Sequence, residues 1–203
     1  MKALVTGFEP FGGETINASL AAVRQLPPRA GSLEIVTAEL PTSYAHSAAA
    51  LEAAIARTRP GIVLCVGQAG ERAALCVERV AVNLQEADIT DNDGARPADA
   101  PVVPGGPAAY LATLPVRAAV AALHTARLPA QLSMSAGTFV CNHVFYSLMH
   151  LAQIRSAVFL GSFLHVPRLP QQAPPGAPSM PLADIVRGIG IVLEAAAEES
   201  ADR

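Results

Sequence analysis

Two kinds of hydrophobic pattern alternate along this chain. Short continuous apolar runs, of which residues 61–67 (GIVLCVG) are the clearest, are typical of strands buried on both faces. Longer segments in which apolar residues recur every three or four positions lie between these runs and indicate helices. Strands are predicted at residues 2–6, 33–40, 61–67, 75–82, 131–134 and 157–166, and helices at residues 17–25, 43–57, 115–127, 140–153 and 182–199.

The repeated order of strand and helix predicts an α/β fold. We expect a single domain of three layers, α/β/α, around a mostly parallel twisted sheet with helices on both faces. Asn17 or Ser19 is the expected N-cap of the first helix, and Ser43 that of the second. No internal repeat or linker interrupts residues 1–203, which predicts one domain whose ligands bind at the carboxyl ends of the strands.

Two long segments carry no regular pattern. Residues 90–107 are rich in Asp, Asn, Gly and Pro, and residues 167–181 contain six prolines. Structureless segments of this length usually have a function or lie at an interface. We therefore expect these two loops to form the rim of the ligand site and contacts between subunits.

Charge and hydropathy exclude several classes of protein. The net charge is −3, and Lys2 is the only lysine, so no cationic surface for nucleic acid is expected. The longest apolar runs are about half the length that a bilayer crossing requires, so no membrane association is expected. The apolar run after Met1 stops too early for a signal peptide, and we expect the mature chain to begin at or near Met1.

The three cysteines, Cys65, Cys76 and Cys141, do not form a disulfide framework or a zinc motif. Free thiols in a reducing cytosol are the simplest interpretation, with no metal bound. Cys65 lies in the middle of an apolar strand and Cys76 in another apolar segment, so both are expected to be structural. One thiol remains for chemistry.

Cys141 follows a predicted strand and opens a predicted helix, within residues 135–143 (SAGTFVCNH). A thiol in the first turn of a helix experiences the positive end of the helix dipole, which lowers its pKa. The same turn offers unpaired backbone N–H groups that could stabilise an oxyanion. From position alone, a nucleophilic thiol and an inert buried thiol are equally probable interpretations.

A cysteine nucleophile requires a base and a group that orients it. Among five histidines, His165 is the best candidate, because it lies at the end of a predicted strand, two residues before Pro167 turns the chain. A structural histidine at the end of a strand is the alternative. His143 is only two residues from Cys141 and points to a different side of the helix. Glu78 is the candidate carboxylate, since it lies in an apolar strand where either it or Arg79 must face inward; a surface salt bridge with Arg79 is the alternative.

Four segments resemble the motifs of a known family in their order along the chain. They are residues 5–13 (VTGFEPFGG) with Asn17 and Ser19, residues 78–83 (ERVAVN), residues 135–143, and residues 165–167 (HVP) with Leu169, Pro170 and Gln172. The chain resembles pyroglutamyl peptidase type I, also called pyrrolidone-carboxylate peptidase, over nearly its whole length.

This resemblance implies a cysteine exopeptidase that removes N-terminal pyroglutamyl residues with a triad of Cys141, His165 and Glu78. It implies no metal or cofactor, a cytoplasmic location and a homotetramer. The substrate-binding residues that it implies are Phe8, Phe11, Gln68, Phe139 and Val140. Pyroglutamate is a neutral lactam, which an apolar pocket with a few backbone hydrogen bonds can select without a counter-charge.

One position departs from the family pattern: Asp88 stands where many relatives carry an arginine. If that arginine assists the thiolate or the oxyanion, then Arg72 or Arg79 must replace it, or the enzyme is weak. Three rival interpretations stay open. They are a nucleotide-binding module at residues 7–13, which lacks a phosphate-binding Gly-Lys-Ser/Thr motif, a cysteine amide hydrolase of another specificity, and an inactive family member that serves as an oligomeric binding protein.

Overall fold

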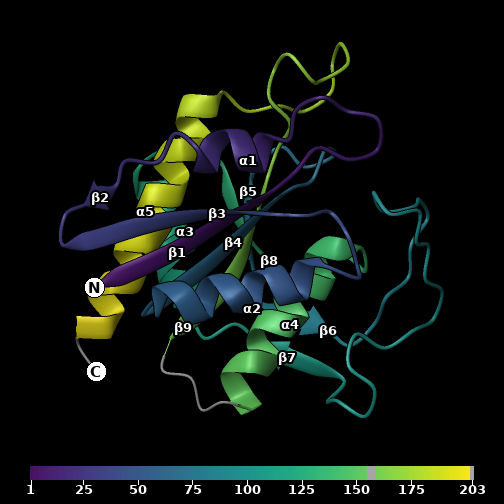
Figure 1. The fold of residues 1–203 in the computed structure, drawn as a ribbon. Coiled ribbons are helices and arrows are strands. Elements are labelled where there is room, and N and C mark those ends of the chain that lie inside the picture. The colour runs from purple at the N-terminus through teal and green to yellow at the C-terminus, as the bar shows by residue number, and fades with distance from the viewer. Residues whose placement is uncertain (155–158, 202–203) are drawn as a thin grey trace.

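The central feature of the computed structural model, which describes residues 1–154 and 159–201, is a seven-stranded sheet (Figure 1). Its strand order is β2-β3-β1-β4-β9-β5-β8. The strands are β1 (Lys2–Phe8), β2 (Arg29–Ala30), β3 (Leu33–Leu40), β4 (Ile62–Gln68), β5 (Leu75–Glu78), β8 (Ala130–Ser133) and β9 (Leu160–Val166). Every residue of β4 and β9 is buried, as their continuous apolar runs predict.

The middle of the sheet is parallel, and its edges are not. β3, β1, β4 and β9 run parallel to one another, while β2 is antiparallel to β3. β5 is antiparallel to β9, and β8 runs parallel to β5. The predicted mostly parallel sheet is therefore confirmed, with a reversed pair of strands at one edge.

Helices cover both faces of this sheet (Figure 1). α1 (Ala18–Val23), α3 (Val116–Thr125) and α5 (Leu182–Ala201) pack on one face, and α2 (Ser47–Thr58) and α4 (Val140–Ile154) pack on the other. The predicted α/β/α layering is confirmed. No helix in residues 1–154 and 159–201 is long and apolar enough to span a membrane.

Side-chain hydrogen bonds to backbone N–H groups precede the first two helices. Asn17 is the N-cap of α1, and its side chain accepts the Ser19 N–H, as predicted. α2 begins at Ser47 and not at Ser43, so that prediction was wrong by four residues. Ser43 instead closes a preceding turn, in which its hydroxyl accepts the His46 N–H and its carbonyl accepts the Ser47 N–H.

The predicted strand at residues 75–82 is two strands. β5 ends at Glu78, and β6 (Val80–Val82) pairs with β7 (Ala109–Leu111) in a separate antiparallel ribbon beside α4. β2 and β7 were not predicted, because two or three residues carry too little periodicity to reveal a strand. Residues 157 and 158 of the predicted last strand lie outside the described residues, and the rest of that strand is confirmed as β9.

Candidate active site

Cys141 is the second residue of α4, directly over the carboxyl end of β4. A Cβ atom added to Gly67 would lie 2.8 Å from the Cys141 Sγ and 2.7 Å from the Phe163 Cζ. Only a residue without a side chain fits at this position of β4. The thiol therefore lies against the backbone of the sheet, on the face that α4 covers.

His165 lies next to that position, on the neighbouring strand. In the parallel pair of β4 and β9, His165 is the register partner of Gly67, so its side chain projects from the same face of the sheet as the thiol. His165 is 4% exposed, and its ring lies 4.8 Å, centroid to centroid, from the ring of Phe163. The structure thus brings the Cys141 thiol, over the end of β4, next to His165, near the end of the neighbouring strand β9.

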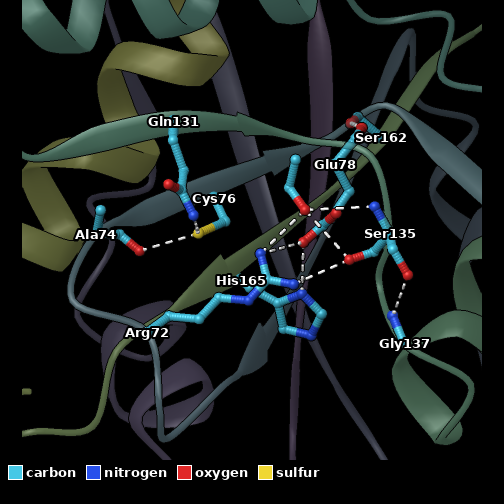
Figure 2. A network of polar contacts seen from close by, with 10 residues as sticks. Arg72, Ala74, Cys76, Glu78, Gln131, Ser135, Gly137, Ser162 and His165 are labelled. Carbon is cyan, nitrogen blue, oxygen red and sulfur yellow. Dashed lines mark hydrogen bonds and ion pairs between the residues drawn. The ribbon is translucent and has the colours of Figure 1, made fainter.

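Glu78 reaches the same histidine from β5, on the other side of β9 (Figure 2). Its Oε1 accepts the Nδ1–H of His165 at 2.8 Å, and the residue is fully buried. A carboxylate only accepts, so Nδ1 carries the ring proton and Nε2 keeps its lone pair. The alternative of a surface salt bridge with Arg79 was wrong, because Glu78 pairs with Arg72 and with His165.

The pKa of the Cys141 thiol is higher than its place at the start of a helix predicts. Burial raises its pKa, the Glu78 carboxylate and Cys65 raise it further, and the Arg72 guanidinium and a backbone hydrogen bond lower it. The expectation of a lowered pKa is therefore corrected, because desolvation of the thiolate outweighs the helix start. In this state Cys141 is a neutral thiol at pH 7. A neutral thiol acts as a nucleophile only with a base that takes its proton.

A small pocket opens beside the thiol. It is lined by the five residues that the resemblance implied, with Cys141 and two more, namely Phe8, Phe11, Asn17, Thr42, Gln68, Phe139, Val140 and Cys141. The rings of Phe11 and Phe139 lie 5.9 Å apart, and Phe8 packs at 6.2 Å on Phe163. None of the lining residues is charged, so the pocket favours a small neutral group with an apolar face.

The side chain of Gln68 does not point its amide freely into this pocket. Its Oε1 accepts the Ala18 N–H at 2.7 Å and a Gln172 Nε2–H at 3.0 Å, and its Nε2 donates to Glu14 at 3.2 Å. These three hydrogen bonds hold the amide within the protein. The side-chain amide of Gln68 is therefore not free to bind a ligand in the pocket.

Tyr44 is a neighbour of the site that sequence reasoning missed. Its ring lies edge-on to Phe139 at 5.7 Å and to His143 at 5.6 Å, and burial, Asp91 and Cys141 together raise the pKa of its phenol. The aromatic residue stands alone before an alanine-rich helix, a pattern that gives no signal of a site. Asn17 and Thr42 also line the pocket, and only Asn17 had been noted, as part of the first motif.

The other two cysteines and Asp88 are not members of the Glu78–His165 pair and do not line the pocket. Cys65 is fully buried in β4, where burial raises the pKa of its thiol to about 12, and Cys76 is buried in β5. Asp88 is exposed and is not among the charged groups of the described residues that act on the Cys141 thiol. No group of three or more His, Cys, Asp or Glu side chains in residues 1–154 and 159–201 could hold a metal ion.

A family model described as pyroglutamyl peptidase matches residues 1–199. The chain belongs to the pyroglutamyl peptidase family. Among its similar relatives is the pyrrolidone-carboxylate peptidase of Gloeobacter violaceus, 53% identical with 96% of each chain covered. That of Streptomyces coelicolor is 48% identical, with 100% of this chain and 94% of the relative covered. Membership sets aside the interpretation of residues 7–13 as a nucleotide-binding module.

Solved structures of this family share the fold. The crystal structure of pyroglutamyl peptidase I from Bacillus amyloliquefaciens superposes with a TM-score of 0.94 at 43% identity and covers 97% of both chains. A mutant pyrrolidone carboxyl peptidase from Pyrococcus furiosus gives a TM-score of 0.94 at 36% identity, with 98% of this chain and 99% of that chain covered. The whole α/β/α architecture, including the reversed edge, therefore belongs to a pyroglutamyl peptidase.

Proposed function

We propose that Cys141, His165 and Glu78 are the nucleophile, the base and the orienting carboxylate of this pyroglutamyl peptidase. The enzyme is a cysteine peptidase that hydrolyses the amide bond after an N-terminal pyroglutamyl residue. The observation that carries the assignment is the 2.8 Å hydrogen bond between Glu78 Oε1 and His165 Nδ1. With the proton on Nδ1, Nε2 is the basic nitrogen of the ring. His165 is the register partner of Gly67, the residue against which the Cys141 thiol packs.

The reaction follows from these roles. The Cys141 Sγ attacks the pyroglutamyl carbonyl carbon, and the thiol proton moves to His165 Nε2. The tetrahedral intermediate collapses as the C–N bond breaks, and the leaving amine takes the proton from the imidazolium. Water, deprotonated by His165, then attacks the thioester and releases pyroglutamate and the free thiol. Backbone N–H groups in the first turn of α4 are the donors available for the oxyanion.

We place the lactam ring in the pocket formed by Phe8, Phe11, Gln68, Phe139 and Val140. The tilted rings of Phe11 and Phe139 can cover the apolar carbons of the neutral five-membered lactam ring. An uncyclised N-terminal glutamine or glutamate brings an ammonium group, and the uncharged pocket offers it no partner. The substrates are therefore peptides with a cyclised N-terminus.

We further propose that residues 1–203 form one catalytic domain and that the enzyme acts in the cytoplasm as a homotetramer, without metal or cofactor. The three free cysteines support a reducing compartment, and the family resemblance supports the tetramer. Light scattering at working concentration tests the assembly. A mass near that of one chain in a fully active sample would contradict it.

The triad is tested by hydrolysis of a pyroglutamyl-coupled chromogenic amide. Cys141→Ala and His165→Ala should each lose nearly all activity with an intact fold, and Glu78→Gln should lower kcat about 100-fold or more, because it keeps shape and loses charge. Cys65→Ser serves as the control, and it should cost stability and not chemistry. An inactive wild-type protein would indicate a family member that has lost its activity. Equal cleavage of a glutaminyl amide would indicate an amide hydrolase of other specificity.

A further inference from the structure

Arg72 extends from the loop between β4 and β5 into the site (Figure 2). Its Nη1 lies 3.1 Å from Oε1 of Glu78, the same oxygen that accepts the His165 Nδ1–H. Its side chain is 26% exposed, so the guanidinium reaches water on one side and the buried carboxylate on the other. The hydrogen-bonded pair of Glu78 and His165 thus has a cationic neighbour, the Arg72 guanidinium.

The same guanidinium also holds the segment that leads to the nucleophile. Nη1 donates to the Ser133 hydroxyl at 3.0 Å, and Nη2 donates to the Ser135 carbonyl at 2.9 Å. Ser133 ends β8, and the Ser135 hydroxyl accepts the Gly137 N–H in the loop before α4. The planar guanidinium, with its fork of N–H donors, therefore contacts both the Glu78 carboxylate on β5 and the segment before α4 that leads to Cys141.

The charge of Glu78 requires such a partner. The residue is fully buried, and its Oε2 has no hydrogen-bond partner within the part of the chain that the structure describes. A buried carboxylate beside only a neutral imidazole would lack compensation for its lost hydration. Arg72 supplies that compensation and turns Oε1 toward His165.

We propose that Arg72 is a positioning residue of the reaction, which holds Glu78 against His165 and fixes the segment before Cys141. This inference rests on the proposed triad. Arg72 also lowers the pKa of the Cys141 thiol, whereas burial, Glu78 and Cys65 raise it. The titratable and charged groups around Arg72 and the thiol are Cys76 and Glu78 on β5, His165 on β9, Cys65 on β4, Tyr44 and Cys141.

The test compares Arg72→Gln, Arg72→Lys and the control Arg117→Gln. Arg117 is an exposed arginine on α3, which covers the face of the sheet opposite to α4 and Cys141. Two readouts are used, kcat and KM for a pyroglutamyl chromogenic amide, and the rate of Cys141 alkylation by iodoacetamide as a function of pH. Neither of the two Arg72 variants changes a residue that lines the apolar pocket, so the KM of each should stay within about threefold of the wild-type value.

Arg72→Gln should lower kcat at least tenfold and shift the rising part of the alkylation profile to higher pH. Arg72→Lys should keep the wild-type position of that profile, because the charge remains, and should still lose kcat, because one ammonium cannot reach Glu78, Ser133 and Ser135 together. Arg117→Gln should match the wild type in both readouts.

Wild-type kcat and an unshifted alkylation profile in Arg72→Gln would overturn the proposal while the triad stands. If Arg72→Gln does not fold, Arg72→Lys decides, and full kcat in that variant would overturn the positioning role of the fork. Inactivity of the wild-type protein itself, or full activity of Cys141→Ala, would count against the proposed function and not against Arg72 alone.

Discussion

At the scale of single residues, the reactivity of Cys141 depends on competing environments. Its place in the first turn of α4 favours the thiolate, and its position against the sheet disfavours it. The second effect is larger, so the proton stays on sulfur, and in the proposed mechanism His165 takes it. The chemistry of the site therefore depends on how closely neighbouring atoms approach the thiol, and Gly67 sets that approach.

Gly67→Ala should abolish activity and lower stability. The new methyl group would lie 2.8 Å from Cys141 Sγ and 2.7 Å from Phe163 Cζ, closer than real Cβ contacts allow, so the thiol and the ring must move. Overpacking of this kind costs about 1–3 kcal/mol of unfolding free energy. Urea unfolding and hydrolysis of a pyroglutamyl amide measure the two effects.

Gly190→Ala is the matched control, because nothing lies within 4 Å of the position that its Cβ would take on α5. It should keep full activity and gain up to about 1 kcal/mol through helix propensity. A Gly67→Ala variant with wild-type kcat would show that the thiol does not depend on this contact.

At the scale of elements, the loop that carries Phe11 is held by segments distant in sequence. Glu14 Oε2 accepts Nε2–H groups of Gln172 at 2.6 Å and of Gln68 at 3.2 Å. Glu14 Oε1 accepts from Arg168, with the Nη2 at 3.2 Å. On its other side, Asn92 donates to Glu9 and to the Pro10 carbonyl. The loops at residues 90–107 and 167–181 thus contact the loop that carries Phe11, but they contribute no lining residue to the pocket. Their expected roles at the rim of the site and between subunits stay predictions.

Glu14→Gln should raise KM for pyroglutamyl substrates several-fold and leave kcat nearly unchanged. The substitution replaces an acceptor oxygen by a donor that would face another donor, which releases the loop from Gln172 or Arg168. Steady-state kinetics separates the two constants. Glu39→Gln is the control, because that exposed carboxylate pairs with Arg24 away from the pocket. An unchanged KM in Glu14→Gln would show that the loop keeps its position without this carboxylate.

The pattern of elements could be predicted where it was long and periodic, and not where it was short. The helices and the buried strands of the parallel centre follow from apolar periodicity, and Cys141 and His165 follow from their places at element ends. The reversal of β5 could not be predicted, because four residues between loops do not reveal a direction. Alternation on β5 indicated only that Glu78 or Arg79 faces inward, and the fold decided for Glu78. The residues of the proposed lactam pocket were implied by the resemblance alone.

At the scale of the whole molecule, acid stability depends on a histidine outside the proposed chemistry. His143 is buried in α4 against Tyr44, neither ring nitrogen has a hydrogen-bond partner among the described residues, and burial lowers its pKa from 6.5 to about 4. Between these pH values the unfolded chain binds a proton that the folded chain does not. Stability therefore falls as the pH drops below about 6.5, and for this residue the loss is about 2 kcal/mol between pH 7 and pH 5.

His143→Leu should remove that loss, so that its unfolding free energy changes by about 2 kcal/mol less than the wild-type value between pH 7 and pH 5. Urea unfolding at the two pH values measures the difference. His46→Gln, at an exposed histidine, should retain the wild-type slope. Parallel pH dependences in wild type and His143→Leu would mean that another group accounts for the acid sensitivity.

The hydrogen bonds from Glu14 to Arg168 and Gln172 join residues 154 and 158 positions apart. During synthesis, the segment that holds the Phe11 loop is made after every strand of the seven-stranded sheet. A nascent chain that ends before residue 172 has its first strand and its thiol, but not the contacts that fix the rim of the pocket. The rim of the pocket therefore takes its final position only after the strands of the sheet have been made.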